Sequence, residues 1–262
     1  MMLLRPLANI QFLRALFFPI LRNLNLEIKW THDVTRRPFF LMTWLHKSYW
    51  FYGSNRERDE LAQFQDLIDE GDCVVEIGGH IGYLSQIFEE LVGENGAVYV
   101  AEPTSFSRSF LEKNVSPKTT ILPLAMSDRV GALDFYTEEH GGFTNSLMAE
   151  FTETADEGLQ NTQKISNTAI TKVTVPASTV DAVCDAYGIK PDFLKIDVEG
   201  AELNVLRGAA ASLAKVKALM VEVNRNQDEV YDLLFAHGFK AKDAKGNVID
   251  DECRSGNIFF HR

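Results

Sequence analysis

Three glycines that follow an acidic residue make the segment CVVEIGGHIGYLSQIF the first candidate for chemistry. Glu76 lies near the end of its apolar run, and Gly78, Gly79 and Gly82 come directly afterwards. Glycine weakens the interior of a helix or strand, but it lets the backbone approach a ligand without a Cβ clash. Because ligands bind at the carboxyl ends of strands in open parallel sheets, we expect this turn to bind one.

The spacing of these glycines excludes two common nucleotide-binding loops. A dinucleotide-binding turn needs the pattern G-x-G-x-x-G. Counted from Gly78 its second glycine falls on His80, and counted from Gly79 it falls on Ile81. No Walker lysine follows, which excludes a phosphate-binding loop. The remaining pattern, acid-x-G-x-x-x-G, has an acid that suits a cationic group better than a pyrophosphate.

A second acid ends the next apolar run, VYVAEP. Glu102 lies about 20 residues after Gly82, where a carboxylate commonly binds ribose hydroxyls. A ribose site without a phosphate loop indicates S-adenosylmethionine, which carries a sulfonium and no phosphate. The third apolar run ends in LAMSD, which we expect to lie near the adenine. The candidate cofactor-binding residues are Glu76, Gly78, Gly79, His80, Gly82, Tyr83, Glu102, Pro103, Ala125 and Ser127.

The segment PDFLKIDVEGAELNVLRGA contains the candidate catalytic residues, Asp197 and Glu199. Asp197 ends an apolar strand pattern and is expected to face the methyl donor beside the glycine turn. A carboxylate in such a place is costly unless it is used. Glu199 and Glu202 also suit the first turn of the following helix, where the macrodipole favours acids. Lys195 is expected to pair with one of these two glutamates.

The next apolar strand pattern ends in MVEVNRN, which adds Glu222 and Asn224. With Asp197 they would form an oxygen-rich cluster on adjacent strand ends. Such a cluster could hold Mg²⁺ or bind the hydroxyls of a substrate. We favour hydroxyl binding and expect no metal.

The elements that must position these residues alternate between strand and helix. This alternation predicts an α/β fold with a doubly wound, mostly parallel seven-stranded sheet and helices on both faces. The predicted strands are 73–77, 97–102, 119–126, 192–198, 217–223, 239–243 and 257–262. The predicted helices are 56–72, 82–92, 104–115, 201–214 and 227–238.

Two stretches fall outside this alternation. A β-rich insertion over about 129–190 has strand patterns at 131–137 and 172–178, joined by a long polar connection. Long connections inside a domain are commonly functional, so we expect a lid or a substrate-binding insertion. The other stretch, residues 1–55, is an aromatic-rich appendage that we expect to be helical, which leaves 56–262 as the catalytic domain.

Composition limits the partners and the setting. The chain has 262 residues and a formal net charge of −11, which argues against a generic nucleic-acid grip. Its 3 cysteines form no CxxC pair and suggest neither a zinc site nor a disulfide framework, which favours the cytoplasm. Arginines and prolines interrupt the apolar residues 1–30 too often for a membrane span. For these residues we favour packing on the core or on a partner subunit of a homo-oligomer over contact with a membrane surface.

The segments VVEIGGHIGYLSQIF, VYVAEPTSFSRSFLEKNV, ILPLAMSDRVGALDFY, NSL, VPASTVDAV and FLKIDVEGAELNVLRGA together resemble the FkbM-type methyltransferases. This resemblance implies a class I, Rossmann-like methyltransferase fold with S-adenosylmethionine as the donor. It also implies methylation of a hydroxyl, often on a sugar, glycan or natural product. Carried over by position, Glu76–Gly82 is the turn that binds the methionine part of the donor, and Glu102 is the ribose acid.

The sequence departs from the family's usual D-x-G-A-N-x-G pattern at three positions of the first motif. Glu76 replaces an aspartate, Gly79 an alanine and His80 an asparagine. The longer Glu76 side chain reaches farther, and we expect Gly79 to give it room.

The residues by themselves leave other readings open. Asp197 is the expected general base, and His140 is the alternative if the insertion folds over the site. A nicotinamide-dependent oxidoreductase is disfavoured by the failed glycine pattern. A non-catalytic binding protein on the same fold would account for the altered first motif.

Overall fold

The computed structural model describes residues 23–52, 57–137, 146–147, 171–250 and 253–262. It divides into two compact units, residues 1–58 and 59–262. The alternative base His140 and most of the connection between the insertion strands lie outside the described residues. Within the described residues, no helix combines the length and the apolar character that a membrane crossing requires.

The larger unit is built on an eight-stranded sheet in which β9, β3, β4 and β5 run parallel beside β10. Within it, β13 and the two-residue β12 run opposite to the other strands, so β11 is antiparallel to both of its neighbours. The predicted mostly parallel sheet is therefore confirmed, with β12 as an addition at its edge. In spatial order the strands are β12 (Val248–Ile249), β11 (Lys240–Asp243), β13 (Gly256–His261), β10 (Ala218–Val223), β9 (Phe193–Ile196), β3 (Cys73–Ile77), β4 (Ala97–Ala101) and β5 (Thr120–Leu122).

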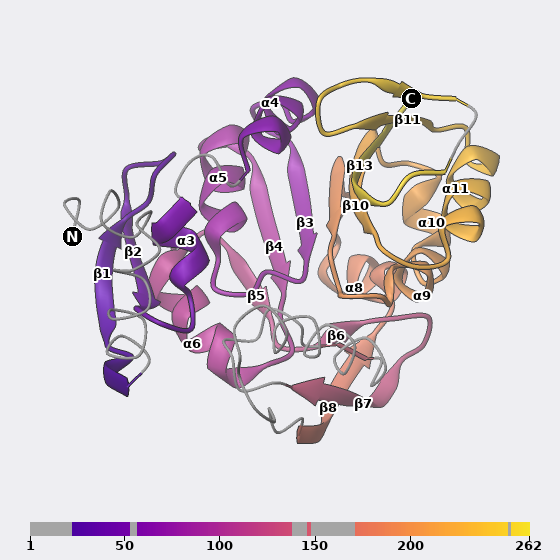
Figure 1. Cartoon of the computed structure of the whole chain (residues 1–262). Coiled ribbons are helices and arrows are strands. Elements are labelled where there is room, and N and C mark those ends of the chain that lie inside the picture. The colour runs from indigo at the N-terminus through magenta and orange to yellow at the C-terminus, as the bar shows by residue number, and fades with distance from the viewer. Residues whose placement is uncertain (1–22, 53–56, 138–145, 148–170, 251–252) are drawn as a thin grey trace. The chain divides into compact units, whose positions relative to one another are not determined.

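Helices cover both faces of this sheet (Figure 1). The helices are α4 (Arg58–Leu67), α5 (Tyr83–Val92), α6 (Ser105–Asn114), α8 (Val180–Tyr187), α9 (Glu202–Arg207), α10 (Ala210–Leu213) and α11 (Gln227–Ala236). Helices α8 to α11 pack on the face that presents Val75 and Leu194, and α4, α5 and α6 pack on the face that presents Val74 and Phe193. Successive strand residues point to opposite faces, so Glu76 and Lys195 share the second face.

An aromatic cluster anchors that second face. The ring of Phe64 in α4 lies 5.0 Å from that of Phe88, 5.9 Å from Phe193 and 5.3 Å from Phe259, measured between centroids. Phe64 is fully buried, as its place on the apolar face of the predicted helix requires. The cluster fixes α4 and α5 against strands β9 and β13, below the strand ends that hold the polar residues.

Two predicted elements are divided in the structure. The strand predicted over 119–126 was wrong as a single strand, because Pro123 separates β5 from β6 (Ala125–Met126), which joins another sheet. The helix predicted over 201–214 is split into α9 and α10. A Cβ at Gly208, between them, would lie 2.1 Å from the Ser127 carbonyl oxygen, and the Asp181 carboxylate accepts the N–H groups that begin α10.

The insertion forms a three-stranded sheet in the order β6-β8-β7, with β7 (Gly131–Thr137) antiparallel to β8 (Thr171–Ser178). Both strands match the predicted patterns closely. Ser146 lies beside this sheet and forms an isolated antiparallel bridge with Tyr136. The β-rich character of the insertion is therefore present in the described residues.

The smaller unit differs from the predicted helical appendage over residues 27–42. These residues form a hairpin of β1 (Glu27–Thr31) and β2 (Pro38–Met42), paired from Glu27 with Met42 to Thr31 with Pro38. The short helix α3 (Lys47–Tyr52) follows. Phe39 and Leu41 alternate into the interior of the unit, which is the period-2 pattern of a half-buried strand.

Candidate active site

The site is built at the carboxyl ends of β3, β4, β9 and β10, where parallel strands place their following residues together. The glycine turn after β3 is held from below by its neighbour β4. The N–H groups of Gly78 and Gly79 donate to the Ala101 carbonyl at 3.0 and 3.3 Å. Gly78, His80 and Gly82 have φ of 86°, 47° and 86°, in the left-handed region. This conformation explains His80, because histidine, like the family's asparagine, is enriched there.

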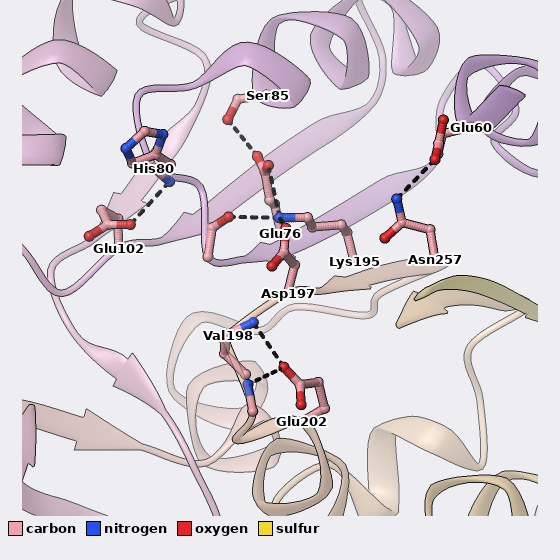
Figure 2. A network of polar contacts seen from close by, with 12 residues as sticks. Glu60, Glu76, His80, Ser85, Glu102, Lys195, Asp197, Val198, Glu202 and Asn257 are labelled. Atoms are coloured by element: carbon pink, nitrogen blue, oxygen red, sulfur yellow. Dashed lines mark hydrogen bonds and ion pairs between the residues drawn. The ribbon is translucent and has the colours of Figure 1, made fainter. Parts of the chain in front are cut away.

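Glu76 is enclosed beneath this turn, with 1% of its surface exposed. Its Oε2 accepts a hydrogen bond from the Ser85 hydroxyl of α5 at 2.5 Å, and its Oε1 lies 3.9 Å from Lys195 Nζ (Figure 2). Burial raises the pKa of Glu76 to about 7, while Lys195 and the Ser85 bond oppose the rise. Ser85 was not foreseen, although a polar residue on the inner face of a predicted helix is a signal that could have indicated it.

Gly79 leaves room for the Val100 side chain, whereas Glu76 was the expected neighbour. A Cβ there would lie 2.1 Å from Val100 Cγ1 but 3.8 Å from Glu76 Oε2, which is an ordinary contact distance. The expectation that Gly79 accommodates the longer acid is therefore wrong. The glycine is needed because the turn lies directly on the β4 side chain.

Glu102, the predicted ribose acid, is 6% exposed and already bonded to the protein. Its Oε2 accepts the His80 N–H at 3.0 Å, and its Oε1 accepts the Thr104 N–H at 2.9 Å and the Thr104 hydroxyl at 2.6 Å. A carboxylate has about four acceptor positions, so these bonds leave about one for a ligand hydroxyl. Burial raises the pKa of Glu102, and the bonds from Thr104 and His80 oppose this.

The other predicted donor-site residues lie in three places. Tyr83 begins α5 and is buried, and Pro103 follows Glu102, with its carbonyl accepting a hydrogen bond from Arg108 at 2.5 Å. Ala125 and Ser127 are buried in and beside β6, where Ala125 packs in an apolar cluster of the small sheet. Contact of these residues with a nucleoside stays a prediction.

Asp197 follows β9 directly and stands beside the glycine turn. A Cβ at Gly78 would lie 1.9 Å from the Asp197 carbonyl oxygen, and the Asp197 N–H donates to Ile77 O at 3.1 Å. The Asp197 carboxylate is about one third exposed and pairs with Lys195 at 3.1 Å. The predicted proximity of turn and aspartate is therefore confirmed.

Lys195 and Glu199 differ from the expectation, whereas Glu202 lies in the first turn of α9 as predicted. Lys195 forms its ion pairs with Asp197 and Glu76. Glu202 begins α9 and its Oε1 accepts the N–H groups of Gly200 at 2.8 Å and Val198 at 3.4 Å, as Figure 2 shows. Glu199 does not enter the helix, since it lies in the left-handed region with φ of 54°.

A cluster of three acids surrounds the space beside Asp197. Asp197, Glu199 and Glu222 each offer an oxygen within 4.8 Å of the others, a spacing that a shared proton or a cation could bridge. The charge of Asp197 and burial raise the pKa of Glu222 far above its ordinary value, which favours its protonated form. Glu199 therefore joins Asp197 and Glu222 in the predicted oxygen-rich cluster, while the place of Asn224 in it stays a prediction. The absence of a metal stays a prediction.

The insertion reaches this loop through one described residue. Ser146 is fully buried, exchanges two backbone hydrogen bonds with Tyr136, and its hydroxyl donates to the Glu199 carbonyl at 2.6 Å. Sequence reasoning singled out the segment NSL without giving Ser146 a role. The contact joins residues 53 positions apart, so no local pattern could have indicated it.

A family model and a curated protein match this chain. The family model described as "Methyltransferase FkbM domain" matches residues 76–241, from the glycine turn through β11. The curated protein "Hexuronic acid methyltransferase AglP" of Haloferax volcanii is 24% identical over 174 residues, which are 66% of this chain. The match spans 64% of that relative's length.

Solved structures also align, with low scores. The precorrin-6y C5,15-methyltransferase of Geobacter metallireducens is 14% identical, with a TM-score of 0.42 over 79% of this chain and 88% of that one. The fibrillarin of Aeropyrum pernix with natively bound S-adenosyl-L-methionine is 13% identical, with a TM-score of 0.40 over 89% and 86%. These scores are too low to support an inference about function.

The family model spans the glycine turn, Glu102, the Asp197 loop and the sheet that places them. It covers well over half of the 262 residues. This chain belongs to the FkbM methyltransferase family.

Proposed function

We propose that this protein is an S-adenosylmethionine-dependent O-methyltransferase that acts on a hydroxyl of a sugar, glycan or natural-product acceptor. One observation carries the proposal: Asp197, a partly exposed carboxylate, stands beside the glycine turn with Lys195 at 3.1 Å. Membership of the family supports methyl transfer. The relative named a hexuronic acid methyltransferase supports a sugar acceptor.

The residues of the turn fit the donor. The left-handed Gly78 and Gly82 bring backbone close to the ligand, and Glu102 retains about one acceptor position for a ribose hydroxyl. When bound, S-adenosylmethionine supplies a methyl group that its sulfonium already activates.

The chain's own residues then align the acceptor and remove its proton. Holding reactants in line supplies a large part of the rate enhancement in such displacements. Asp197 accepts the hydroxyl proton, because the adjacent Lys195 favours its ionised form. The raised pKa of Glu222 favours its protonated form, which can donate a hydrogen bond within the cluster.

Asp197→Asn tests this assignment, because it keeps the shape of the side chain and removes the base. We expect turnover to fall by about 10²- to 10⁴-fold. The affinity for S-adenosylhomocysteine, measured by calorimetry, should stay unchanged. Turnover is read as S-adenosylhomocysteine release with a panel of neutral and uronic glycosides. Asp66→Asn is the matched control, since Asp66 is exposed and pairs with Lys242 on β11.

Three results would contradict the proposal. Unchanged turnover in Asp197→Asn would remove Asp197 as the base. Stabilisation of the wild type by NAD and not by S-adenosylhomocysteine in a thermal-shift assay would favour an oxidoreductase. Binding of neither ligand would favour a non-catalytic protein on this fold.

A further inference from the structure

The side chain of Lys195 is the least expected charge in the sheet. It lies within β9 between apolar residues, and 3% of it is exposed. A charge taken this far from water is costly unless partners compensate it closely. Burial lowers the pKa of Lys195, but the charges of Asp197 and Glu76 outweigh it and the pKa stays above its ordinary value. Lys195 is therefore a buried ammonium ion.

Three oxygens from separate elements meet this ammonium. Lys195 Nζ donates to the Gly78 carbonyl at 2.7 Å, pairs with Asp197 Oδ2 at 3.1 Å and lies 3.9 Å from Glu76 Oε1 (Figure 2). Glu76 and Lys195 are also direct partners in the parallel register of β3 and β9. Gly78 O and Asp197 Oδ2 lie within hydrogen-bond distance of the ammonium, whereas Glu76 interacts with it through charge across a longer distance.

The contact with Gly78 O gives the lysine more than a packing role. Gly78 belongs to the donor turn, and Asp197 is the proposed base. The two backbones touch so closely that a Cβ at Gly78 would lie 1.9 Å from Asp197 O. The Lys195 side chain thus contacts both the carbonyl of the donor turn and the Asp197 carboxylate.

We propose that Lys195 is a positioning residue that holds the donor turn and the Asp197 carboxylate together as one unit. This inference rests on the proposed function for its catalytic consequence, but the link itself is a property of the structure. Its removal leaves the Gly78 carbonyl without its charged donor and Asp197 without its counter-ion. Donor affinity and turnover should then decline together, whereas Asp197→Asn lowers turnover alone.

Lys195→Met tests the proposal with Lys242→Met as the matched control. Lys242 lies on β11 of the same sheet, its side chain is 13% exposed, and it pairs with Asp66 at 3.0 Å. We expect Lys195→Met to weaken S-adenosylhomocysteine binding at least about tenfold, the effect of losing a charged hydrogen bond. It should also raise the donor KM and lower kcat. Lys242→Met should change none of these.

A double-mutant cycle read by NMR distinguishes a link through Lys195 from a purely structural role of this residue. In protein labelled with ¹⁵N-glycine, Asp197→Asn should shift the amide signal of Gly79, whose nitrogen is bonded to the Gly78 carbonyl carbon. The same substitution made in Lys195→Met should leave that signal in place, because the connecting ammonium is absent. An equal shift in both backgrounds would overturn the proposal.

A second measurement uses the native lysine in case Lys195→Met does not fold. With ¹⁵Nζ-lysine labelling, a buried and bonded ammonium should give a slowly exchanging signal, and Asp197→Asn should move it. No response of that signal to Asp197→Asn would overturn the link. Failure of the wild type to bind S-adenosylhomocysteine would refute the proposed function, while both spectroscopic tests would still decide the link.

Discussion

Replacing Gly79 with alanine, the residue usual in the family, should destabilise this protein. The position is buried, and its added Cβ would lie 2.1 Å from Val100 Cγ1. Ordinary contacts begin at 3.4 Å, so the two groups must separate by about 1.3 Å. Val100 is fully buried, and its β-branched side chain is stiff about χ1, so it cannot rotate away freely.

The size of the effect follows from two opposing terms. Overpacking of a well-filled core costs about 1–3 kcal/mol. Replacing a glycine whose φ is not left-handed recovers about 0.4–1 kcal/mol by restricting the unfolded chain. Because the 2.1 Å approach is severe, the overpacking cost should lie in the upper part of its range, and we expect Gly79→Ala to lower the free energy of unfolding by about 1–2 kcal/mol. For a unit of this size that corresponds to a fall in Tm of about 2–8 °C.

Urea unfolding of four proteins, followed by far-UV circular dichroism, measures this cost: the wild type, Gly79→Ala, Val100→Ala and the double variant. The alanine methyl should occupy space that Val100→Ala vacates. The two substitutions should therefore compensate each other by at least about 0.5 kcal/mol. Strictly additive costs, or a Gly79→Ala protein as stable as the wild type, would refute the argument. Reverting the first motif to the family pattern should be tolerated only with a smaller residue at position 100.

Two further predictions concern the Asp197 loop. Burial raises the pKa of Glu202 to about 7 from an ordinary 4.5, so the folded protein keeps this proton longer than the unfolded chain. Its contribution to the free energy of unfolding should thus fall, by at most about 3 kcal/mol, as pH rises from about 4.5 to about 7. Urea midpoints measured at pH 5 and pH 8 should show this decline in the wild type and not in Glu202→Gln. An equal decline in Glu202→Gln would contradict the assignment. Ser146→Ala, which deletes the donor to the Glu199 carbonyl, should cost about 1–3 kcal/mol in thermal unfolding. The exposed Ser109→Ala, which deletes a similar bond to Phe106 O, should cost under about 0.5 kcal/mol.

The order of strands and helices could be predicted from the sequence, because each element has its own period. Apolar runs of four to six residues followed by helical patterns indicated β3, β4, β9 and β10, and the insertion strands β7 and β8 alternated clearly. The sequence also predicted that Glu76, Glu102 and Asp197 lie at one edge of the sheet, because the carboxyl ends of parallel strands lie together. The hairpin of β1 and β2 was missed, although its aromatic and β-branched residues favour strands.

Other features depended on contacts between distant residues. The sequence could suggest that Lys195 needed an acid, but only the register of β3 and β9 placed Glu76 beside it and the turn above it. Likewise, nothing local to Gly79 revealed Val100 as its neighbour, and nothing local to Ser146 revealed the Glu199 carbonyl. Residue types and spacing therefore determined which chemistry this chain can perform. The tertiary structure decided which charges compensate one another, because burial and distance exist only once the strands are paired.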